Sequence, residues 1–526
     1  MDTKALRQKI LDLAIRGKLV PQDPNDEPAS VLLERIREQK KQMVKEGKLK
    51  AKDIKNDSII FVGEDSLHYE KFADGSVKCV DDEIPFELPE GWAWARLNQI
   101  YNFIDYRGAT PNKISSGVPL ITAKNVKSGY IDYTVDEYIS EEEYWKRQQR
   151  GTSRLGDILF TTEAPLGNAA IANIDKFSAG QRLITFQHYG NCTLNNTTFL
   201  YFILSDIFQN QLHTRKTGST VAGIKASILK TLVLPVPPLK EQEKIYNACG
   251  NLLTLTERIE SDKQDVLSII SKTKSKILDL AIRGQLVPQN PDDEPASALL
   301  ERICAEKEEL IKQGKIKRDR KESVIFKGED NSYYEKFSDG KCRSIEDELP
   351  FELPDGWEWC NLSMIGTTNI GLTYKPTDID PTGTMVLRSS NIVDDAIDLN
   401  DLVRVKTKIR ENQYVQLNDI LICARNGSKA LVGKCALIDE LKEPASFGAF
   451  MAVYKTDYYK YVLHYLRSSQ FRNVFDDGNS TAINQLTQDM LKRALIPFPP
   501  ISEQERIVNR ISELLSRLRD IEKSLS

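Results

Sequence analysis

Histidine and cysteine, which often supply nucleophiles, proton shuttles and metal ligands, are sparse and scattered in this chain. The histidines stand at positions 68, 188, 213 and 464, and the cysteines at 79, 192, 249, 304, 342, 360, 423 and 435. No two cysteines have a CxxC spacing, and no histidine lies beside a cysteine pair. This distribution argues against a zinc site and against a histidine acid–base pair. Scattered thiols also suit a reducing compartment.

Other motifs for catalysis are missing as well. The sequence has no Gly-x-x-x-x-Gly-Lys-Ser/Thr phosphate loop, and it has no Asn-Pro-Pro-Tyr-type motif of an adenine methyltransferase. The loop Ala164–Asn168 holds neither serine nor cysteine, so it offers no nucleophile. Acidic residues and lysines form no convincing nuclease constellation. We therefore expect no metal site and no catalysis in this chain, and we assign any catalysis to partners.

Lysines and arginines gather after two helical segments. The first group is Lys40, Lys41, Lys45, Lys48, Lys50, Lys52 and Lys55, and the second is Lys315, Lys317, Arg318, Arg320 and Lys321. We interpret both groups mainly as solvated helix ends, with contact to DNA phosphates as the alternative. The net charge of −4 means that nucleic-acid binding would need local basic surfaces rather than a global positive field.

The element that must organise the chain is a long helical run from Pro237 to Gly284. Its two predicted heptad seams are Ile245, Leu252, Ile259 and Val266, and Ala248, Leu255 and Ile269. Because one glycine and no proline interrupt the run, we predict a coiled-coil helix of roughly 65–70 Å. Such an apolar stripe needs a partner helix.

The two ends of the chain together repeat this central run. The tail, residues 499–526, begins as the central run begins, and the head, residues 1–17, ends as it ends. Leu13-Ala-Ile-Arg-Gly17 recurs as Leu280-Ala-Ile-Arg-Gly284. We predict two repeated units, an antiparallel pair of long helices and a pseudo-twofold axis. An ordinary helical hairpin is the alternative.

The segments between the helices share landmarks but differ in detail. Phe86–Trp92 matches Phe351–Trp357, with tryptophans that we interpret as core anchors, and both copies carry a β-rich segment before this motif. Residues 93–234 and 358–496 share only a skeleton. Because short strands mix with a few helices, we predict an α+β fold. Like helices with unlike globular domains suggest a spacer that holds two readers of different specificity.

The composition is ordinary for a globular protein. Charged residues make up 28% and hydrophobic residues 40% of the 526 residues. The sequence shows no run of 18 apolar residues and no signal-peptide pattern, so we expect a cytoplasmic protein with no membrane partner.

The combined motifs resemble the specificity (S, or HsdS) subunit of type I restriction–modification systems. They are Asp-Ile-Leu-Phe, the Gly-Ser-Thr loop, Pro-x-Pro-Pro-Leu/Ile-x-Glu-Gln-Glu-Lys/Arg-Ile, and Leu-Asp-Leu-Ala-Ile-Arg-Gly-Lys/Gln-Leu-Val-Pro. The resemblance spans nearly the whole chain and occurs twice. It implies two globular α/β target-recognition domains, each reading one half of a bipartite double-stranded DNA site. The helices would set the spacing and dock two modification (methyltransferase) subunits and, through them, restriction (motor and nuclease) subunits. S-adenosylmethionine, ATP and Mg would bind in those partners, and no cofactor would bind to this chain.

The resemblance also gives domain boundaries. We expect helical residues at 1–27, a helix and β-rich insertion at 28–87, the first recognition domain at 88–236, the central helix at 237–287, a second helix and insertion at 288–352, the second recognition domain at 353–498, and the C-terminal helix at 499–526.

Candidate DNA contacts are the polar and basic residues of the divergent domains, because arginine suits guanine, asparagine and glutamine suit adenine, and lysine or serine can hold the backbone. In the first domain they are Arg107, Thr110, Lys124, Asn125, Arg215, Lys216, Ser219 and Lys225. In the second domain they are Lys375, Arg388, Ser389, Asn391, Arg425, Asn426, Lys429, Asn479, Ser480 and Gln485.

Other interpretations stay open at this point. The chain can be an orphan or phase-variable recognition subunit, or part of a fused single-chain restriction–modification enzyme. A coiled-coil scaffold that binds only proteins is a third possibility, but it does not explain two differing domains with matched boundaries.

Overall fold

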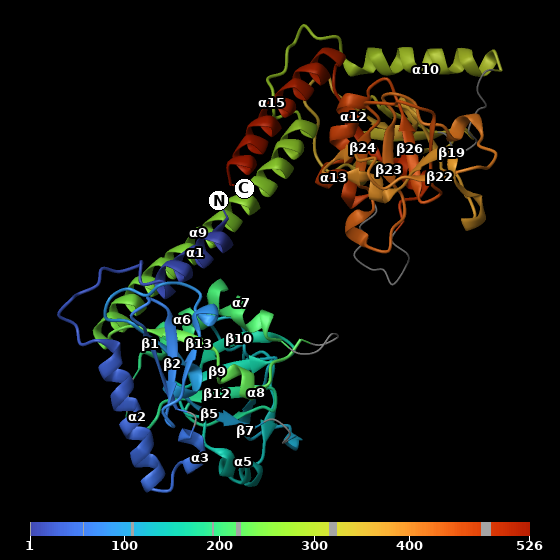
Figure 1. Cartoon of the computed structure of the whole chain (residues 1–526). Helices are drawn as coiled ribbons and strands as arrows, with labels where there is room; N and C mark the ends of the chain where they lie inside the picture. The colour runs from blue at the N-terminus through green and yellow to red at the C-terminus, as the bar shows by residue number, and fades with distance from the viewer. Residues whose placement is uncertain are drawn as a thin grey trace. The chain divides into compact units, whose positions relative to one another are not determined.

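A computed structural model describes residues 2–55, 57–106, 110–191, 194–216, 222–314, 323–474 and 485–525. The chain divides into two compact units, Met1–Lys263 and Gln264–Ser526. Helix α9, Leu239–Ile282, supplies its first part to one unit and its last part to the other (Figure 1). Its 44 residues span about 66 Å, so the predicted long central helix is confirmed.

The first unit carries a helix, a small sheet and a mixed domain before α9. Its elements are α1 Thr3–Ile15, α2 Ala29–Lys45, α3 Ala51–Ile54, β1 Ser58–Val62, β2 His68–Phe72, β3 Val77–Cys79, β4 Ala93–Arg96, α4 Leu97–Ile100, β5 Asn102–Asp105, β6 Lys113–Ile114, β7 Val118–Ile121, β8 Tyr138–Ile139, α5 Glu141–Arg147, β9 Ile158–Thr162, β10 Leu166–Ile171, β11 Ser178–Ala179, β12 Leu183–Gln187, α6 Asn196–Leu204, α7 Asp206–Thr214, α8 Ala226–Leu229 and β13 Val233–Val236.

The second unit repeats this order after α9. Its elements are α10 Ala296–Lys312, β14 Ser323–Lys327, β15 Tyr333–Phe337, β16 Cys342–Ser344, β17 Glu358–Asn361, α11 Leu362–Ile365, β18 Thr367–Ile370, β19 Ile379–Leu387, β20 Ile392–Val393, β21 Ala396–Ile397, β22 Val403–Val405, β23 Ile420–Cys423, β24 Cys435–Leu437, β25 Ala445–Phe447, β26 Met451–Lys455, α12 Tyr459–Leu466, α13 Ser469–Asn473, α14 Gln488–Arg493, β27 Leu495–Phe498 and α15 Ile501–Leu525.

Sheet topology shows that the two units are repeats of one fold. Within the described residues, the main sheets have the orders β10-β9-β12-β5 and β24-β23-β26-β18. In each unit a second sheet has a central strand that pairs in parallel on one side, β7 with β11 or β19 with β25. That strand pairs antiparallel on the other side, with β8 or β22. The predicted α+β fold with an internal repeat is confirmed.

In the first unit, α1 lies antiparallel along α9 (Figure 1). The Thr3 hydroxyl donates to Glu260 at 2.5 Å, and Arg7 pairs with Glu257 at 3.3 Å, so the start of α1 meets the later part of this α9 segment. The buried face of α1 joins the core of the first unit. That face consists of Ile10, Leu11, Ala14 and Ile15.

In the second unit, α15 lies antiparallel along the last part of α9. Lys274 pairs with Glu522 at 2.8 Å, and Ile507 and Ile511 of α15 share a core with Ile277 and Ala281 of α9. Head and tail therefore each cover one part of the central helix, as the split repeat predicts.

The predicted heptad seams were only partly right. Ile245 is fully buried, but Leu255 and Ile269 of the second seam are 52% and 60% exposed. The buried stripe continues instead through Cys249 and Leu253. A straight helix drifts by about 20° per heptad, so a strict seven-residue seam leaves the contact line.

The repeated Leu-Ala-Ile-Arg-Gly segment is a helix end. Gly17 and Gly284 have φ of +65° and +66°, and the residue after each one donates its N–H back into the last turn at 2.8 Å. A side chain on Gly17 would collide with Pro89 and Trp92. This explains why the helix-end motif recurs together with the Pro-x-Gly-Trp motif.

Candidate nucleic-acid interface

The divergent part of the first unit is organised by a turn after β7, which Asn125 holds. The Asn125 carboxamide oxygen accepts from the Thr122 backbone N–H at 2.9 Å and from the Thr122 hydroxyl at 2.8 Å. Its amide donates to the carbonyls of Asp132 and Val135 at 3.0 and 2.8 Å. Asn125 is 1% exposed, so all four of its hydrogen-bonding positions are used inside the protein.

The second unit builds the same turn with Asn391. Its oxygen accepts from the Arg388 N–H at 2.8 Å, and its amide donates to the carbonyls of Asp398 and Asp401, both at 2.9 Å. Asn391 is also fully buried. Residue type predicts Asn125 and Asn391 as DNA contacts. In this structure neither amide is available to a base, so both hold the loop, and we leave them out of the proposed contacts.

Beside the first turn lies a cavity of about 220 Å³, lined by apolar residues such as Leu120 and Ala164 as well as by charged and polar ones. Glu137 pairs with Lys113 at 2.8 Å and with Lys124 at 3.8 Å. The Thr110 hydroxyl donates to Gln181 at 2.9 Å. Thr110 and Lys124, both predicted DNA contacts, line this same cavity.

At the rim of this cavity, Arg182 forms an ion pair with Glu163 at 3.1 Å. Both side chains are about half exposed, so each keeps a face open to solvent. Glu163 also forms an isolated antiparallel bridge with Gly223. The segment that leads to Lys225 therefore passes beside this ion pair.

The other predicted residues of the first domain lie elsewhere or outside the description. Arg215 pairs with Glu83 at 3.4 Å, which ties it to the segment before the domain. Lys216 and Lys225 are exposed. Arg107 and Ser219 fall outside the described residues.

In the second domain, Arg425 is the centre of a comparable cluster. Its guanidinium lies over the ring of Phe450 at 5.5 Å, and its backbone bridges to Gln485. The next residue, Asn426, donates from its amide to the Ser389 hydroxyl at 3.4 Å. The structure thus brings together four of the predicted residues: Ser389, Arg425, Asn426 and Gln485.

The remaining predicted residues of the second domain are peripheral to this cluster. Arg388 pairs with Asp401 at 2.8 Å and is partly buried. Lys375 and Lys429 are exposed. Asn479 and Ser480 lie outside the described residues.

Strand pairing shows that the two clusters occupy the same place in the repeated fold. Thr161 pairs with Leu183, and Cys423 pairs with Met451. Glu163 and Arg425 each stand two residues beyond the first member of these pairs. The first domain thus carries an acid where the second carries a base.

The same pairing aligns Arg182 with Phe450, since each stands just before the second member of its pair. Glu163, Arg182 and Phe450 were missed by the sequence analysis. Aligning Asp-Ile-Leu-Phe of the first domain with Asp-Ile-Leu-Ile of the second would have aligned Glu163 with Arg425, because each follows its motif at the same distance.

Family comparison agrees with the repeat. The profile of the family described as "Type I restriction modification DNA specificity domain" matches residues 89–268 and 354–526. The chain belongs to this family.

Relatives of this specificity family align over nearly the whole chain. The specificity subunits of type I restriction enzymes EcoAI and EcoEI, both from Escherichia coli, are 29% and 27% identical to it. Each alignment covers 97% of this chain, with 89% of the EcoAI subunit and 88% of the EcoEI subunit.

Solved structures support the specificity-family fold. A chain from work on complex assembly and conformational transition of the type I R-M system aligns with a TM-score of 0.53 at 17% identity. That alignment covers 84% of this chain and 94% of the other. Within the described residues, no helix has the length and apolar character to cross a membrane. The same residues contain no group of three or more side chains suited to hold a metal ion.

Proposed function

We propose that this chain is the DNA-recognition subunit of a type I restriction–modification complex, and that each recognition domain reads one half of a bipartite site. The boundaries proposed for these domains are 88–236 and 353–498. The observation that carries the proposal is the matched pair of clusters, Glu163 with Arg182 and Arg425 with Phe450. One scaffold that presents opposite charges at corresponding positions suits two readers of different sequences.

The chemistry of these side chains fits base recognition in the major groove. Arginine can donate two hydrogen bonds to guanine, and a carboxylate can accept one from the amino group of cytosine. We assign Arg182 and Glu163 to one half-site and Arg425 with Gln485 to the other. Thr110, Ser389 and Asn426 lie beside these groups and complete the proposed reading surface.

Exposed lysines would contact the phosphates. We assign this role to Lys124, Lys216, Lys225, Lys375 and Lys429, whose charges need no base-specific geometry. These lysines must be gathered locally near the DNA, because the whole chain carries a net charge of −4. Arg107, Ser219, Asn479 and Ser480 remain predicted contacts from the sequence, and Arg215 and Arg388 are assigned to the edge of the surface.

The helices are proposed as spacer and docking elements. Leu252 and Leu255, in the first unit's part of α9, are 38% and 52% exposed, and Ile269, in the second unit's part, is 60% exposed. These residues support docking of two modification subunits, and through them restriction subunits. The chain itself would perform no catalysis, and S-adenosylmethionine, ATP and Mg would bind in those partners in the cytoplasm.

A methylation experiment tests this function. The chain would be co-expressed with its modification subunit in a host without DNA methylation, and N6-methyladenine would be mapped by sequencing. We expect a single split motif with one methylated adenine on each strand.

A domain exchange tests the independence of the readers. Replacing residues 88–236 with the same region of another specificity subunit should change one half of the motif and leave the other half intact. A change in both halves would contradict independent readers. Binding of the modification subunit without any methylated motif would contradict a recognition role.

A further inference from the structure

The small sheet β1-β2-β3 in the first unit has an apolar face that the described part of its own unit leaves partly exposed. Cross-strand pairing joins Ile59, Lys71 and Val77 in one row, and Phe61, Tyr69 and Cys79 in the next. Ile59, Phe61 and Val77 are 44%, 40% and 54% exposed. We call these six residues the first outer face.

The second unit repeats this face on β14-β15-β16. The corresponding rows are Val324, Lys336 and Cys342, and Phe326, Tyr334 and Ser344, which form the second outer face. Val324 and Phe326 are 39% and 40% exposed. The aromatic pair recurs too, with ring centroids 6.0 Å apart for Phe61 and Tyr69 and 5.8 Å apart for Phe326 and Tyr334.

The opposite side of the first sheet is fixed to the unit. Glu70 of β2 forms a buried ion pair with Arg96 of β4 at 2.7 Å and accepts from the Ser58 hydroxyl at 2.5 Å. Ile60 and Val80 pack in a small core with Trp94. The sheet is therefore held rigidly with its outer face turned to solvent.

Charge within the two small sheets favours a basic protein surface over DNA, although Glu83 and Glu348 are already paired with Arg96 and Arg343. Acidic residues outnumber basic ones in residues 58–83 and in residues 323–348. The acidic residues at corresponding positions are Glu64 and Glu329, Asp65 and Asp330, Asp74 and Asp339, Asp81 and Glu346, Asp82 and Asp347, and Glu83 and Glu348. Such rims repel phosphates and attract a basic protein surface.

Both units carry the same outer face, and this likeness bears on how many partner subunits bind. The proposed DNA-reading clusters differ between the units, as two different half-sites require. The outer faces instead keep the same apolar, aromatic and lysine positions in both units. A surface kept alike in both repeats suits a partner that is the same at both, which is one subunit bound twice.

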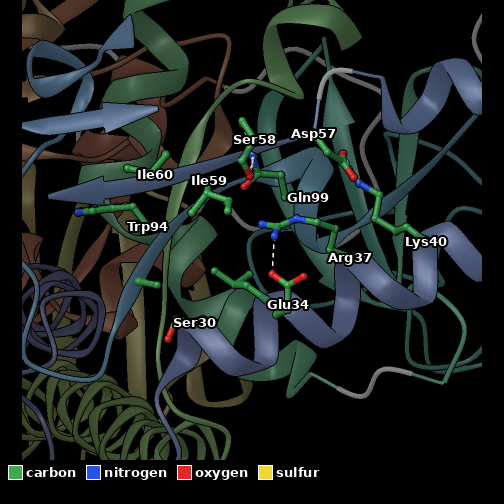
Figure 2. Close-up of a pocket in the computed structure, with 12 residues that line it drawn as sticks. Ser30, Glu34, Arg37, Lys40, Asp57, Ser58, Ile59, Ile60, Trp94 and Gln99 are labelled. Atoms are coloured by element: carbon green, nitrogen blue, oxygen red, sulfur yellow. Dashed lines mark hydrogen bonds and ion pairs between the residues drawn. The ribbon is translucent and has the colours of Figure 1, made fainter. Parts of the chain in front are cut away.

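A cavity adjoins the first outer face. It has a volume of about 160 Å³ and lies between α2 and β1. Figure 2 shows the side chains of Ile59, from β1, and Arg37, from α2, directed into this space, with Arg37 paired to Glu34. One partner side chain can enter beside Ile59, which would anchor a docked surface.

We propose that the two outer faces dock two copies of one protein subunit, through a partner patch of apolar side chains ringed by lysine and arginine. In the complex proposed above, this subunit is the modification subunit, so the inference rests on that function. Each docked copy would bury the Phe–Tyr pair at the centre of its contact and would place its basic residues against the acidic rim.

Native cysteines on the faces provide the test. Cys79 and Cys342 are exposed, whereas Cys249, Cys360, Cys423 and Cys435 are buried and serve as internal controls. Alkylation of the full chain would be followed by peptide mass spectrometry, alone, with the modification subunit, and with DNA carrying the methylated motif. We expect the modification subunit to slow labelling of Cys79 and Cys342 by about tenfold or more, as burial at an interface core predicts. DNA alone should leave both rates unchanged.

Variants test the number of sites. Phe61→Glu should reduce the complex from two modification subunits to one by native mass spectrometry, and Phe61→Glu with Phe326→Glu should weaken binding of both by about tenfold or more. Trp145→Glu changes an aromatic residue of α5 that is 64% exposed, and it should leave the stoichiometry unchanged. Circular dichroism would confirm that each variant is folded.

The outcomes separate this inference from the proposed function. If the modification subunit binds but both cysteines label freely and both Phe variants assemble normally, the docking faces are wrong and the recognition function stands. Protection by DNA alone would assign the faces to DNA and overturn the proposal. If the wild-type chain binds no modification subunit, the proposed function and this inference both fail.

Discussion

The indole N–H of Trp92 donates a hydrogen bond to the carboxylate of Glu241 at 2.9 Å, across 149 residues of sequence. Glu241 also accepts from the Gln22 amide at 3.1 Å, and it is 1% exposed. Burial raises the pKa of Glu241. The second unit repeats the contact between Trp357 and Glu503 at 3.0 Å. One carboxylate thus joins the start of a long helix to the entrance of each domain.

Removing this carboxylate should destabilise one unit. Glu241→Ala leaves the buried Trp92 indole N–H without its acceptor, which costs about 1–3 kcal/mol, whereas the Gln22 amide still donates to the Gly17 carbonyl. We expect faster hydrogen exchange in the first unit, measured by mass spectrometry on the full chain. Glu503→Ala is the matched control and should affect the second unit instead. Equal effects of either variant on both units would show that the contacts do not act locally.

Arg182 and Arg425, one in each proposed reading cluster, should each determine the sequence of one half-site. Arg425→Ala should weaken discrimination in one half of the motif by about 1–3 kcal/mol, the usual value of a bidentate arginine–guanine contact. Arg182→Ala should act only on the other half. Relative methylation of a library of variant sites would measure both effects. Loss of methylation at all sites equally would instead indicate a phosphate contact or a folding defect.

Lengthening α9 should lengthen the gap between the half-sites. Inserting seven helix-forming residues between Ser261 and Asp262 adds about 10 Å and nearly two full turns, so the faces of the helix stay almost in phase. We expect a gap longer by about three base pairs, since the duplex rises about 3.4 Å per pair. The same insertion after Gly47, which has open space around it, should leave the gap unchanged. An unchanged gap in the α9 variant would mean that this helix does not set the spacing.

Stability of the first domain should depend on Asp157 near pH 6. Burial raises the pKa of Asp157 to about 6, although its carboxylate accepts from the Arg154 N–H at 2.8 Å. As the pH falls through 6, the folded domain takes up a proton that the unfolded chain does not yet bind, so folding is favoured. This contribution is complete below the pKa of the unfolded carboxyl and is lost as the pH rises through about 6.

Asp157→Asn should remove this dependence. We expect the variant to be more stable than wild type at pH 7.5 by on the order of 1–3 kcal/mol, and this advantage should shrink at pH 5. Thermal unfolding at both pH values measures it. Asp419→Asn is the matched variant of the second unit: burial also raises the pKa of Asp419, although Lys455 pairs with it at 3.0 Å, so we expect a change in the same direction there. A constant difference between wild type and Asp157→Asn across pH would contradict the raised pKa.

Repeats and helix ends could be predicted from sequence because each rests on local chemistry. Gly17 and Gly284 need a positive φ that other residues rarely adopt, and the Trp and Glu of neighbouring motifs contact each other in both units. The side of α9 that is covered could not be predicted, because exposure of Leu255 and Ile269 depends on where α1 and α15 lie.

Only some residues of the proposed reading clusters could be predicted from the sequence. Residue type suggested Arg425 and Gln485, which the fold does bring together. Residue type also suggested Asn125 and Asn391, which close turns instead, because an asparagine suits a backbone turn as well as a base edge. Glu163 was overlooked because acidic residues are not expected to approach phosphates.

The contact between Thr3 and Glu260 joins residues 257 positions apart. During synthesis, at about 5–20 residues per second, α1 leaves the ribosome roughly 10–50 s before its partner segment of α9 is complete. Over that interval the apolar side chains of Ile10, Leu11 and Ile15 have no α9 to cover them. The buried face of α1 can already pack against α6 in this interval, whereas its polar contacts with Glu257 and Glu260 must wait for the later part of α9.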